Sequence, residues 1–520
     1  MTPPPKPKPT KKSSPAPASI SIVSKPHMLA STVEFYIYDE PKTLFPMRTN
    51  RIIIENGQAE IEGYIQKCLD DKIPGYSFLP QRRVYAAKPE RHLRRTLKLD
   101  PVAEYYLYDL AFRNKKLFRK PHTKDRDHYG YRFESGAPIP ATDAYKAFRA
   151  ALSDYGGKYK YSMSFDVASY FNGIYHHDLV SWIAGLGASD RDTEGFGQFL
   201  REVKSGRSID CLPQGIYPAK MVGNDFLRFI DNYFGLQSEK FVRFMDDMTI
   251  FSNNENSILN DFELIQRILG EKGLSINPKK TQKGESSHQA SERDIDSVKK
   301  NLLKRRRFMV TVGYDEDGEE VVKEQLMKWP LTSDEMKYIK SLLDKPEIEE
   351  DDAELILTLM VDHASKAEKR LPEIIEKFPH LIKSVFNFCS RVSDKEFLSD
   401  VILSALKSSR RLSEFELFWF GWILDVHLLG TKNASAIISL LFENPLATPI
   451  TKAKILEISD QRFGLPDLRD PFLSGGQSDW MAWSSAVGTL SLKPITRNHK
   501  LKYFGSSSNM NHLIAVVLSK

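Results

Sequence analysis

Cysteine is scarce in this chain, with three in 520 residues, and Cys68, Cys211 and Cys389 lie far apart. Their spacing excludes a disulfide framework and a cysteine-rich metal site, and it favours a reducing, cytoplasmic location. The sequence also lacks any apolar run of about 18 residues, so we expect no membrane-spanning segment. The formal net charge is only +6, which excludes a protein that is strongly basic over its whole surface, so any positive surface must be local.

Acidic residues are absent from Met1 to Ala18, a stretch that is rich in Pro, Lys and Ser. Almost nothing in it can be buried to offset the cost of ordering the chain, so we expect residues 1–32 to be disordered. Three interpretations of this segment stay open: an arm that contacts nucleic acid, an organelle-targeting peptide and an added leader. The folded part should begin near Val33, and 520 residues leave room for two to four domains.

The most distinctive motif is the adjacent acid pair Asp246-Asp247, which interrupts an apolar segment that runs from Phe241 to Phe251. Carboxylates inside a strand-like apolar segment are costly to desolvate unless a positive group binds between them. We therefore expect the pair at the tip of a β-hairpin, facing a metal. The alternative is an ordinary solvated turn.

A second carboxylate, Asp166, ends the alternating segment Tyr161 to Phe165, a pattern that predicts a buried strand. Two-metal phosphoryl transfer needs acids from separate chain segments that bring two cations to within roughly 3.5–4 Å of each other. Asp166 and Asp246 meet this need if their strands are neighbours. Between them, the run from Leu212 to Gly215 predicts a loop whose backbone can approach a base or a sugar.

Helical periodicity occurs on both sides of the acid pair. Upstream, one helical face would carry Val222, Phe226, Phe229, Ile230 and Tyr233. Downstream, a helix is predicted from Ile258 to Leu269, ending at Gly270.

Four motifs in this order resemble those of reverse transcriptases. They are the strand with Asp166 and Phe171, the Pro213-Gln214-Gly215 loop, the box from Phe244 to Asp247, and Gly273-Leu274 with Asn277 and Lys280-Thr281. The resemblance covers roughly residues 80 to 290 and implies the fingers and palm of a right-hand polymerase.

The resemblance implies that Asp166, Asp246 and Asp247 are the catalytic residues. With the backbone carbonyl of Val167, they would hold two Mg²⁺ ions, Mn²⁺ being an alternative. Phe171 matches the bulky residue that relatives place under the incoming sugar. A ring there would clash with a 2′-hydroxyl and so favour deoxynucleotides, whereas its ordinary role would be that of a core aromatic.

The same resemblance places Gln214 near the incoming nucleotide and Lys280 near the pyrophosphate. Upstream, the basic run from Lys88 to Arg95 matches the cations that the fingers place on the triphosphate. We select Lys88 and Arg95, since Arg can hold a phosphate in bidentate fashion and Lys adds a point charge. Which arginine of this run points inward stays open.

Two residues depart from the commonest family pattern. Phe244 replaces the usual Tyr of the acid-pair box, which keeps the ring and should not abolish activity. Ile216 stands where many relatives carry a small polar residue, which raises the question of whether a template is copied conventionally.

From about Leu331 the sequence becomes a succession of amphipathic helices with short polar turns. The predicted helices are Glu335 to Leu343, Ala353 to Met360, Leu371 to Phe378, Leu381 to Cys389, Phe397 to Leu406 and Glu414 to Leu428. Pairs that bury their apolar faces against the next pair predict a HEAT-like helical-repeat domain, with an irregular bundle as the alternative.

The predicted fold class is therefore α+β, with right-hand polymerase fingers and palm followed by an all-α helical-repeat domain. We expect an N-terminal region and fingers at 33–150 and a palm with a connecting hairpin, over residues 308–322, at 151–330. The helical domain, in place of a thumb, would occupy 331–520.

A fingers-palm core followed by helical repeats resembles the abortive-infection group of bacterial reverse transcriptases, which defend cells against phage. That group implies a cytoplasmic trimer or hexamer that polymerises deoxynucleoside triphosphates, without a template and from a protein tyrosine. Two alternatives stay open. One is a template-copying reverse transcriptase of a retron or mobile intron, which would need an RNA partner. The other is an inactive polymerase fold that binds nucleic acid as a scaffold.

Aromatic and cationic residues alternate near the end of the chain, for example at Trp480, Trp483, Arg497, Lys500 and Tyr503. Such a pattern can stack bases and neutralise phosphates. An end cap on the helical array is the equally plain interpretation.

Overall fold

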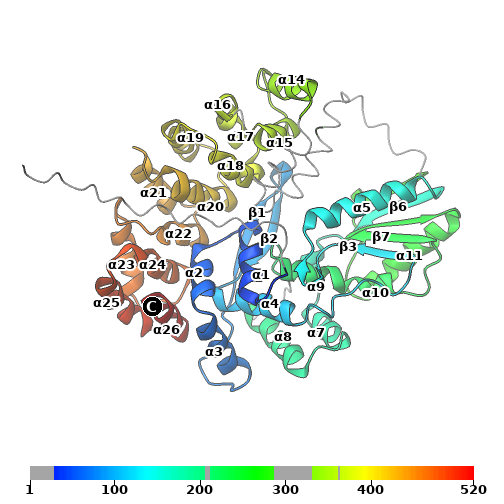
Figure 1. Cartoon of the computed structure of the whole chain (residues 1–520), viewed down its shortest axis with the longest axis horizontal. Helices are drawn as coiled ribbons and strands as arrows, with labels where there is room; N and C mark the ends of the chain where they lie inside the picture. The colour runs from blue at the N-terminus through cyan, green and yellow to red at the C-terminus, as the bar shows by residue number, and fades with distance from the viewer. Residues whose placement is uncertain (1–27, 205–210, 286–301, 303–330, 361–363) are drawn as a thin grey trace, which may run out of the picture.

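The computed structural model describes residues 28–204, 211–285, 302, 331–360 and 364–520 (Figure 1). Residues 1–27 of the expected disordered segment and the hairpin expected at 308–322 lie outside the described residues. The described chain forms N-terminal helices with a β-hairpin, a mixed sheet with its covering helices, and a long succession of C-terminal helices.

The strands around the acidic residues form a five-stranded sheet in the order β3-β7-β8-β6-β9. Their bounds are β3 Arg126–Tyr129, β6 Tyr161–Asp166, β7 Lys240–Phe244, β8 Asp247–Ser252 and β9 Gln282–Glu285. β3 pairs with β7 in parallel, and the other neighbours pair antiparallel. The predicted strand at 161–166 is confirmed, and so is the hairpin tip, because β7 and β8 are joined by a turn at Met245 and Asp246.

Helices cover both faces of this sheet. On one face, Phe148 of α5 (Ala141–Gly156) packs against Val242 and Phe251. On the other, Phe262 of α11 (Glu255–Gly270) packs edge-on against Phe165 at 5.3 Å between ring centroids, and α11 confirms the helix predicted there. The expected boundary between residues 150 and 151 falls inside α5, so the sheet layer begins before that boundary, at β3.

The helices that link β6 to β7 are shorter than the periodicity predicted. They are α6 Tyr170–Gly173, α7 His176–Gly185, α8 Asp190–Val203, α9 Tyr217–Phe226 and α10 Arg228–Asp231. The prediction of one apolar helical face as far as Tyr233 is wrong, because the helix divides at Leu227 and α10 ends at Asp231. This division lets the buried Asp231 carboxylate bind the guanidinium of Arg243 in β7.

The N-terminal part consists of four helices and a hairpin: α1 Thr32–Asp39, α2 Arg48–Asn56, α3 Gln58–Leu69, β1 Arg82–Ala87, β2 Leu93–Lys98 and α4 Pro101–Arg113. α4 is buried on almost every side, as its apolar sequence requires. Asp100 caps its N-terminus by accepting a hydrogen bond from the Ala103 amide, and Pro101 occupies its first turn. A small hairpin, β4 (Phe133–Glu134) and β5 (Ala137–Pro138), lies between β3 and α5.

The C-terminal helices confirm the succession predicted from residue 335 to residue 428 and continue beyond it. Their bounds are α14 Ser333–Leu342, α15 Glu350–Leu359, α16 Ala364–Ala367, α17 Leu371–Lys377, α18 Ile382–Cys389, α19 Lys395–Lys407, α20 Glu414–Ile423, α21 Ala434–Glu443, α22 Pro449–Leu456, α23 Leu465–Ser474, α24 Trp480–Gly488, α25 Pro494–Gly505 and α26 Asn509–Ser519. From α18 to α26 each even-numbered helix packs on the next even-numbered one, while α17, α19 and α21 form a second row (Figure 1).

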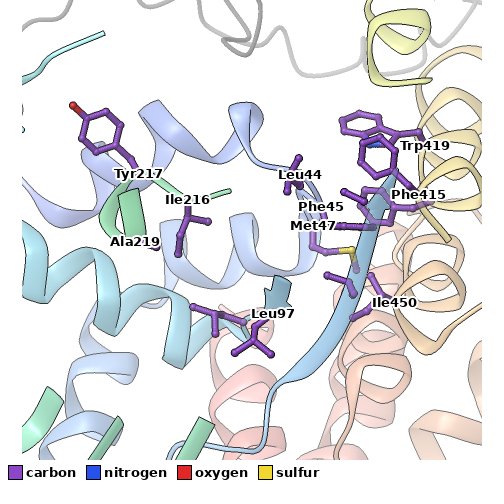
Figure 2. Packing of buried hydrophobic residues seen from close by; sticks show 14 of the residues in the cluster. Leu44, Phe45, Met47, Leu97, Ile216, Tyr217, Ala219, Phe415, Trp419 and Ile450 are labelled. Atoms are coloured by element: carbon purple, nitrogen blue, oxygen red, sulfur yellow. The ribbon is translucent and has the colours of Figure 1, made fainter. Parts of the chain in front are cut away.

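One hydrophobic core runs from the N-terminal part into the C-terminal helices. The Phe45 ring lies 5.5 Å from Phe415 and 5.0 Å from Phe418, both on α20, measured between ring centroids. Figure 2 shows Phe45 and Met47 beside Phe415 of α20 and Ile450 of α22. The helical region is therefore packed directly on the N-terminal part.

The structure also shows the state of the three cysteines and the apolar character of the helices. Cys68, Cys211 and Cys389 are all buried free thiols. Across the part of the chain that the structure describes, none of the helices combines the length and the apolar character needed to cross a membrane.

Candidate active site

The three predicted aspartates come together at one end of the central sheet. Asp166 ends β6 directly opposite Asp247, which begins β8, and Asp246 occupies the turn just before it. Backbone strain flanks the group on both sides, because Met245 and Ser169 adopt left-handed conformations with φ of 57° and 51°. Such conformations are costly for residues other than glycine and are concentrated at functional sites.

The carboxylates are held close together in partly dehydrated surroundings. Asp166 is buried, and its Oδ1 atom lacks a hydrogen-bond partner. Loss of hydration, with the nearby charge of Asp247 second, raises the pKa of Asp246 to about 6. Burial likewise raises the pKa of Asp247, although the side chain is the most exposed of the three. The site thus favours a bound positive charge.

One cation already lies on this group. Lys280 Nζ donates to Asp166 Oδ2 at 2.6 Å, and this bond is the main cause of the raised pKa of Lys280. The Lys280 side chain remains 63% exposed, so it can move away without disturbing the core. The residue predicted on the pyrophosphate side therefore lies at the aspartates.

The position of Val167 suits its predicted role as a backbone ligand. Val167 bridges to Ile276, and the two hydrogen bonds around this bridge run from Ala168 to Ser275 and from Asn277 to Asp166. In such an antiparallel pair the bridging residues turn their own N–H and C=O groups outward. The Val167 carbonyl therefore points away from Ile276, toward the side of β6 on which β8 lies.

The turn of the β1–β2 hairpin approaches the aspartates. Lys88, at this turn, has its pKa lowered by burial and by the charges of Arg94 and Lys280, while Asp246 and Asp166 oppose the shift. On β2, Arg95 Nε donates to Asn172 Oδ1 at 3.2 Å. Lys88 thus lies within reach of the charges of Asp246 and Asp166, and Arg95 binds the residue after Phe171.

Phe171 and the glycine-containing loop meet beside the aspartates. The Phe171 ring packs against α9 at Gly223, where an added Cβ would lie 3.1 Å from the ring. The Phe171 carbonyl accepts a hydrogen bond from the Leu212 amide, and the Gln214 carbonyl accepts one from the Thr96 hydroxyl. The loop is therefore fixed between the palm and the hairpin.

A buried arginine supports the tip of the acid hairpin. Arg243, which is fully buried, binds both carboxylate oxygens of Asp231, at 2.7 and 2.5 Å. Its Nη1 atom also donates to Asn224 Oδ1 at 3.0 Å and to the Met245 carbonyl at 3.1 Å. Arg243 therefore fixes the strained residue that precedes Asp246.

The donor set is chemically suited to divalent ions, since carboxylate and carbonyl oxygens are the ligands that Mg²⁺ prefers. The unpartnered Asp166 Oδ1 atom and the raised pKa of Asp246 fit such a group. Among the described residues, however, the side chains of His, Cys, Asp and Glu do not form a group of three whose present positions could hold a metal ion. At the three aspartates, Lys280 instead forms an ion pair with Asp166.

Sequence reasoning missed the residues that support the site. Arg243 interrupts the apolar run of β7, and a single cation in such a run is a signal that could have been followed. Asn172 gave no such signal, because its partner Arg95 lies 77 positions away. The roles predicted for the nine site residues stay predictions, while the structure does bring Asp166 opposite Asp247 and beside Lys280.

Residues 118–338 match the family model described as "Reverse transcriptase (RNA-dependent DNA polymerase)". The matched segment contains Asp166, Asp246 and Asp247, together with Phe171, Gln214 and Lys280, whereas the β1–β2 hairpin and most of the C-terminal helices lie outside it. This part of the chain is therefore similar to the reverse transcriptase family. No curated protein matches the sequence.

Among solved structures, one that matches is apo telomerase from Candida Tropicalis. It is 11% identical, with a TM-score of 0.29, and the alignment covers 71% of this chain and 73% of that chain. An overall likeness this low carries no argument about fold or function.

Proposed function

We propose that this protein is a DNA polymerase of the reverse transcriptase family that adds deoxynucleotides by two-metal phosphoryl transfer. The observation that carries the proposal is the pairing of Asp166 with Asp247 across β6 and β8, beside Asp246 and within reach of the Lys88 charge. The family match supports the part of this proposal that concerns the reverse transcriptase family.

In this proposal Asp166, Asp246, Asp247 and the Val167 carbonyl would hold two Mg²⁺ ions, which would supply activation of the attacking hydroxyl and stabilisation of the leaving oxygen. Lys280 would release Asp166 and move to the phosphates, which its exposure permits.

Two further cations would hold the triphosphate in this proposal. Arg95 and Lys88 would bind its phosphates from the hairpin, on the side opposite the aspartates. Gln214 would face the incoming nucleotide from its loop.

The finer proposal is template-independent, protein-primed synthesis in antiphage abortive infection, by a cytoplasmic trimer or hexamer. It rests on the two rows of helices that follow the palm, which we interpret as a helical-repeat domain in place of a thumb. Each even-numbered helix from α18 to α26 packs on the next, as expected of a stacked array.

The test is an incorporation assay with the full-length protein, Mg²⁺ and labelled deoxynucleotides, with and without a primer and template. Label on the protein in the absence of template supports the finer proposal. Strict dependence on an RNA template supports the retron or intron alternative instead. Absence of incorporation under every condition, with folded protein, would favour the scaffold alternative and refute the proposed activity.

Phe171→Ala should relax the selection against ribonucleotides. Truncating the ring removes the group that would clash with a 2′-hydroxyl, and we expect the preference for dATP over ATP to fall on the order of tenfold or more. The measurement is kcat/KM for both nucleotides. Because Phe171 also packs on Gly223, Phe171→Leu serves as a control that keeps bulk and should retain most of the preference.

Arg243→Lys should weaken metal binding at the aspartates without unfolding the protein. A lysine can keep the charge beside Asp231 but cannot also reach Asn224 and the Met245 carbonyl, so the turn that carries Asp246 loses its support. We expect affinity for Mn²⁺, measured directly by electron paramagnetic resonance, to fall about 10–100-fold. Unchanged Mn²⁺ affinity in a variant of lower stability would mean that Arg243 serves the fold alone.

A further inference from the structure

A cavity of about 680 Å³ lies between the β1–β2 hairpin, the end of α8 and the C-terminal helices. The three N-termini that border it belong to α20, α22 and α24. Its lining includes Arg82, Arg83, Tyr85, Lys204 and Trp480, whereas none of the three catalytic aspartates contributes to it. The cavity is therefore distinct from the candidate active site.

The acids in the cavity wall are already used by neutral partners. Glu414 accepts hydrogen bonds from the Tyr85 amide at 2.9 Å and from the Thr448 hydroxyl at 2.6 Å. Asp479 accepts from two amides, those of Met481 and Ala482, at the start of α24. Glu414 thus links the hairpin to the start of α22, and Asp479 caps α24.

The arginines of the wall make no direct contact with these acids. Among the residues that the structure describes, the side chains of Arg82 and Arg83 form neither a hydrogen bond nor an ion pair, although the Arg82 charge lies near enough to Glu414 to oppose the rise that burial causes in the pKa of that carboxyl. Beside them, the Tyr85 side chain belongs to a residue that is 39% exposed. Free guanidinium groups next to an accessible aromatic ring suit a ligand that carries both phosphates and bases.

The register of the hairpin connects this cavity to the candidate active site. Arg83 lies opposite Leu97, and Tyr85 lies opposite Arg95, so the four side chains share one face of the hairpin. Arg95 in turn binds Asn172, the residue after Phe171. A strand that leaves the active site along this face would reach the cavity.

We propose that this cavity binds a single-stranded segment of nucleic acid that continues from the active site, with phosphates on Arg82 and Arg83 and a base against Tyr85. The inference rests on the proposed polymerase function for the position of the strand. A volume of about 680 Å³ lies within the range that holds ligands of nucleotide size.

The test measures binding separately from catalysis. Full-length Asp246→Asn protein is titrated against fluorescein-labelled oligodeoxythymidine of about twelve nucleotides, and fluorescence anisotropy measures the binding. Tyr85→Ala in this background should weaken binding about tenfold. Arg82→Ala with Arg83→Ala should also reduce the slope of log Kd against log salt concentration by about 1.4. Arg149→Ala, an exposed arginine on α5, is the matched control and should leave both quantities unchanged.

The salt slope separates phosphate contacts from a loss of stability, which would lower the active fraction without changing the slope. An oligonucleotide with one 5-iodouracil should cross-link to peptides that contain Tyr85 or Trp480. Unchanged slopes in the double variant, or cross-links confined to other regions, would overturn the proposal. Full competition by dTTP at equimolar concentration would also overturn it, in favour of a free nucleotide.

Failure of the polymerase proposal gives a different result. A wild-type protein that incorporates nothing but still binds the oligonucleotide through Arg82, Arg83 and Tyr85 would retain the cavity assignment. A protein that incorporates nucleotides while all cavity variants bind normally would retain the function and lose the cavity assignment.

Discussion

Asp246→Asn should abolish nucleotide incorporation and at the same time stabilise the metal-free protein. Asparagine has nearly the same shape but carries no charge, so it cannot serve as a carboxylate ligand. Loss of about 4 kcal/mol of transition-state stabilisation corresponds to a rate about 10³-fold lower, which is the smallest effect we expect. The same change removes one of three like charges from the partly dehydrated end of the sheet.

The sign of the stability effect follows from the pKa of Asp246. Loss of hydration, followed by the charges of Asp247 and Asp166, raises this pKa to about 6, whereas an unfolded aspartate titrates near 3.9. Above pH 6 the ionised carboxylate therefore destabilises the fold, and this penalty disappears as the pH falls from about 6 toward 4. Because the side chain is partly exposed, we expect about 1–2 kcal/mol rather than the full linkage value.

Thermal unfolding in EDTA at pH 7.5 and pH 5 measures this effect. At pH 7.5 the Tm of Asp246→Asn should exceed that of the wild type by about 2–4 °C. At pH 5 the difference should shrink. Adding Mg²⁺ should raise the Tm of the wild type more than that of the variant. Asp71→Asn, at an exposed loop position, is the control and should change neither Tm nor activity.

Wild-type rates of incorporation by folded Asp246→Asn would refute the site assignment. A variant that is inactive but also less stable at pH 7.5 would contradict the charge-repulsion argument alone. The two parts of the prediction can therefore fail independently.

Local patterns explain why much of the site could be predicted from the sequence. The alternation before Asp166 and the apolar run around Asp246 both reflect strands buried against α5 and α11, and period and polarity are written in neighbouring residues. The positive φ of Gly215, 114°, likewise agrees with a loop position that only glycine adopts easily.

The parts that could not be predicted depend on contacts between distant residues. The division between α9 and α10 accompanies the pairing of Asp231 with Arg243, twelve positions away and on another element. The cavity beside β1 needs the N-termini of three helices from the last third of the chain. No local pattern encodes such contacts, so the alternation of aromatic and cationic residues at Trp480 is compatible with two interpretations.

Glu457→Ala should be the most destabilising substitution among those considered, because it removes the acceptor that joins the N-terminal part to the helical array. Glu457 accepts hydrogen bonds from the Arg48 and Thr49 amides at 3.1 and 2.8 Å, and from the Thr49 hydroxyl at 2.8 Å. These amides begin α2, whose N-cap Met47 makes no side-chain hydrogen bond of its own. A carboxylate from α22's end thus caps a helix more than 400 positions earlier in the chain.

The same carboxylate neutralises a fully buried cation. Lys454 Nζ lies 2.8 Å from Glu457 and 3.0 Å from Asp425, and the Lys454 and Glu457 side chains are both inaccessible to solvent. Removing Glu457 would leave Lys454 with a single carboxylate, Asp425, beside the Trp422 ring, and two α2 amides without an acceptor. Breaking a buried pair in this way costs about 3–5 kcal/mol.

Hydrogen exchange gives the decisive measurement, because a chain with several structural regions need not unfold in one step. In Glu457→Ala, amides of residues 48–52 should lose protection before those of the central sheet, and the denaturant midpoint should fall. Glu457→Gln keeps one acceptor oxygen and should lose less stability. Glu443→Ala, at the exposed end of α21, should change stability by less than about 0.5 kcal/mol. Wild-type protection of residues 48–52 in Glu457→Ala would show that the apolar contacts of Phe45 with α20 suffice to hold the two parts together.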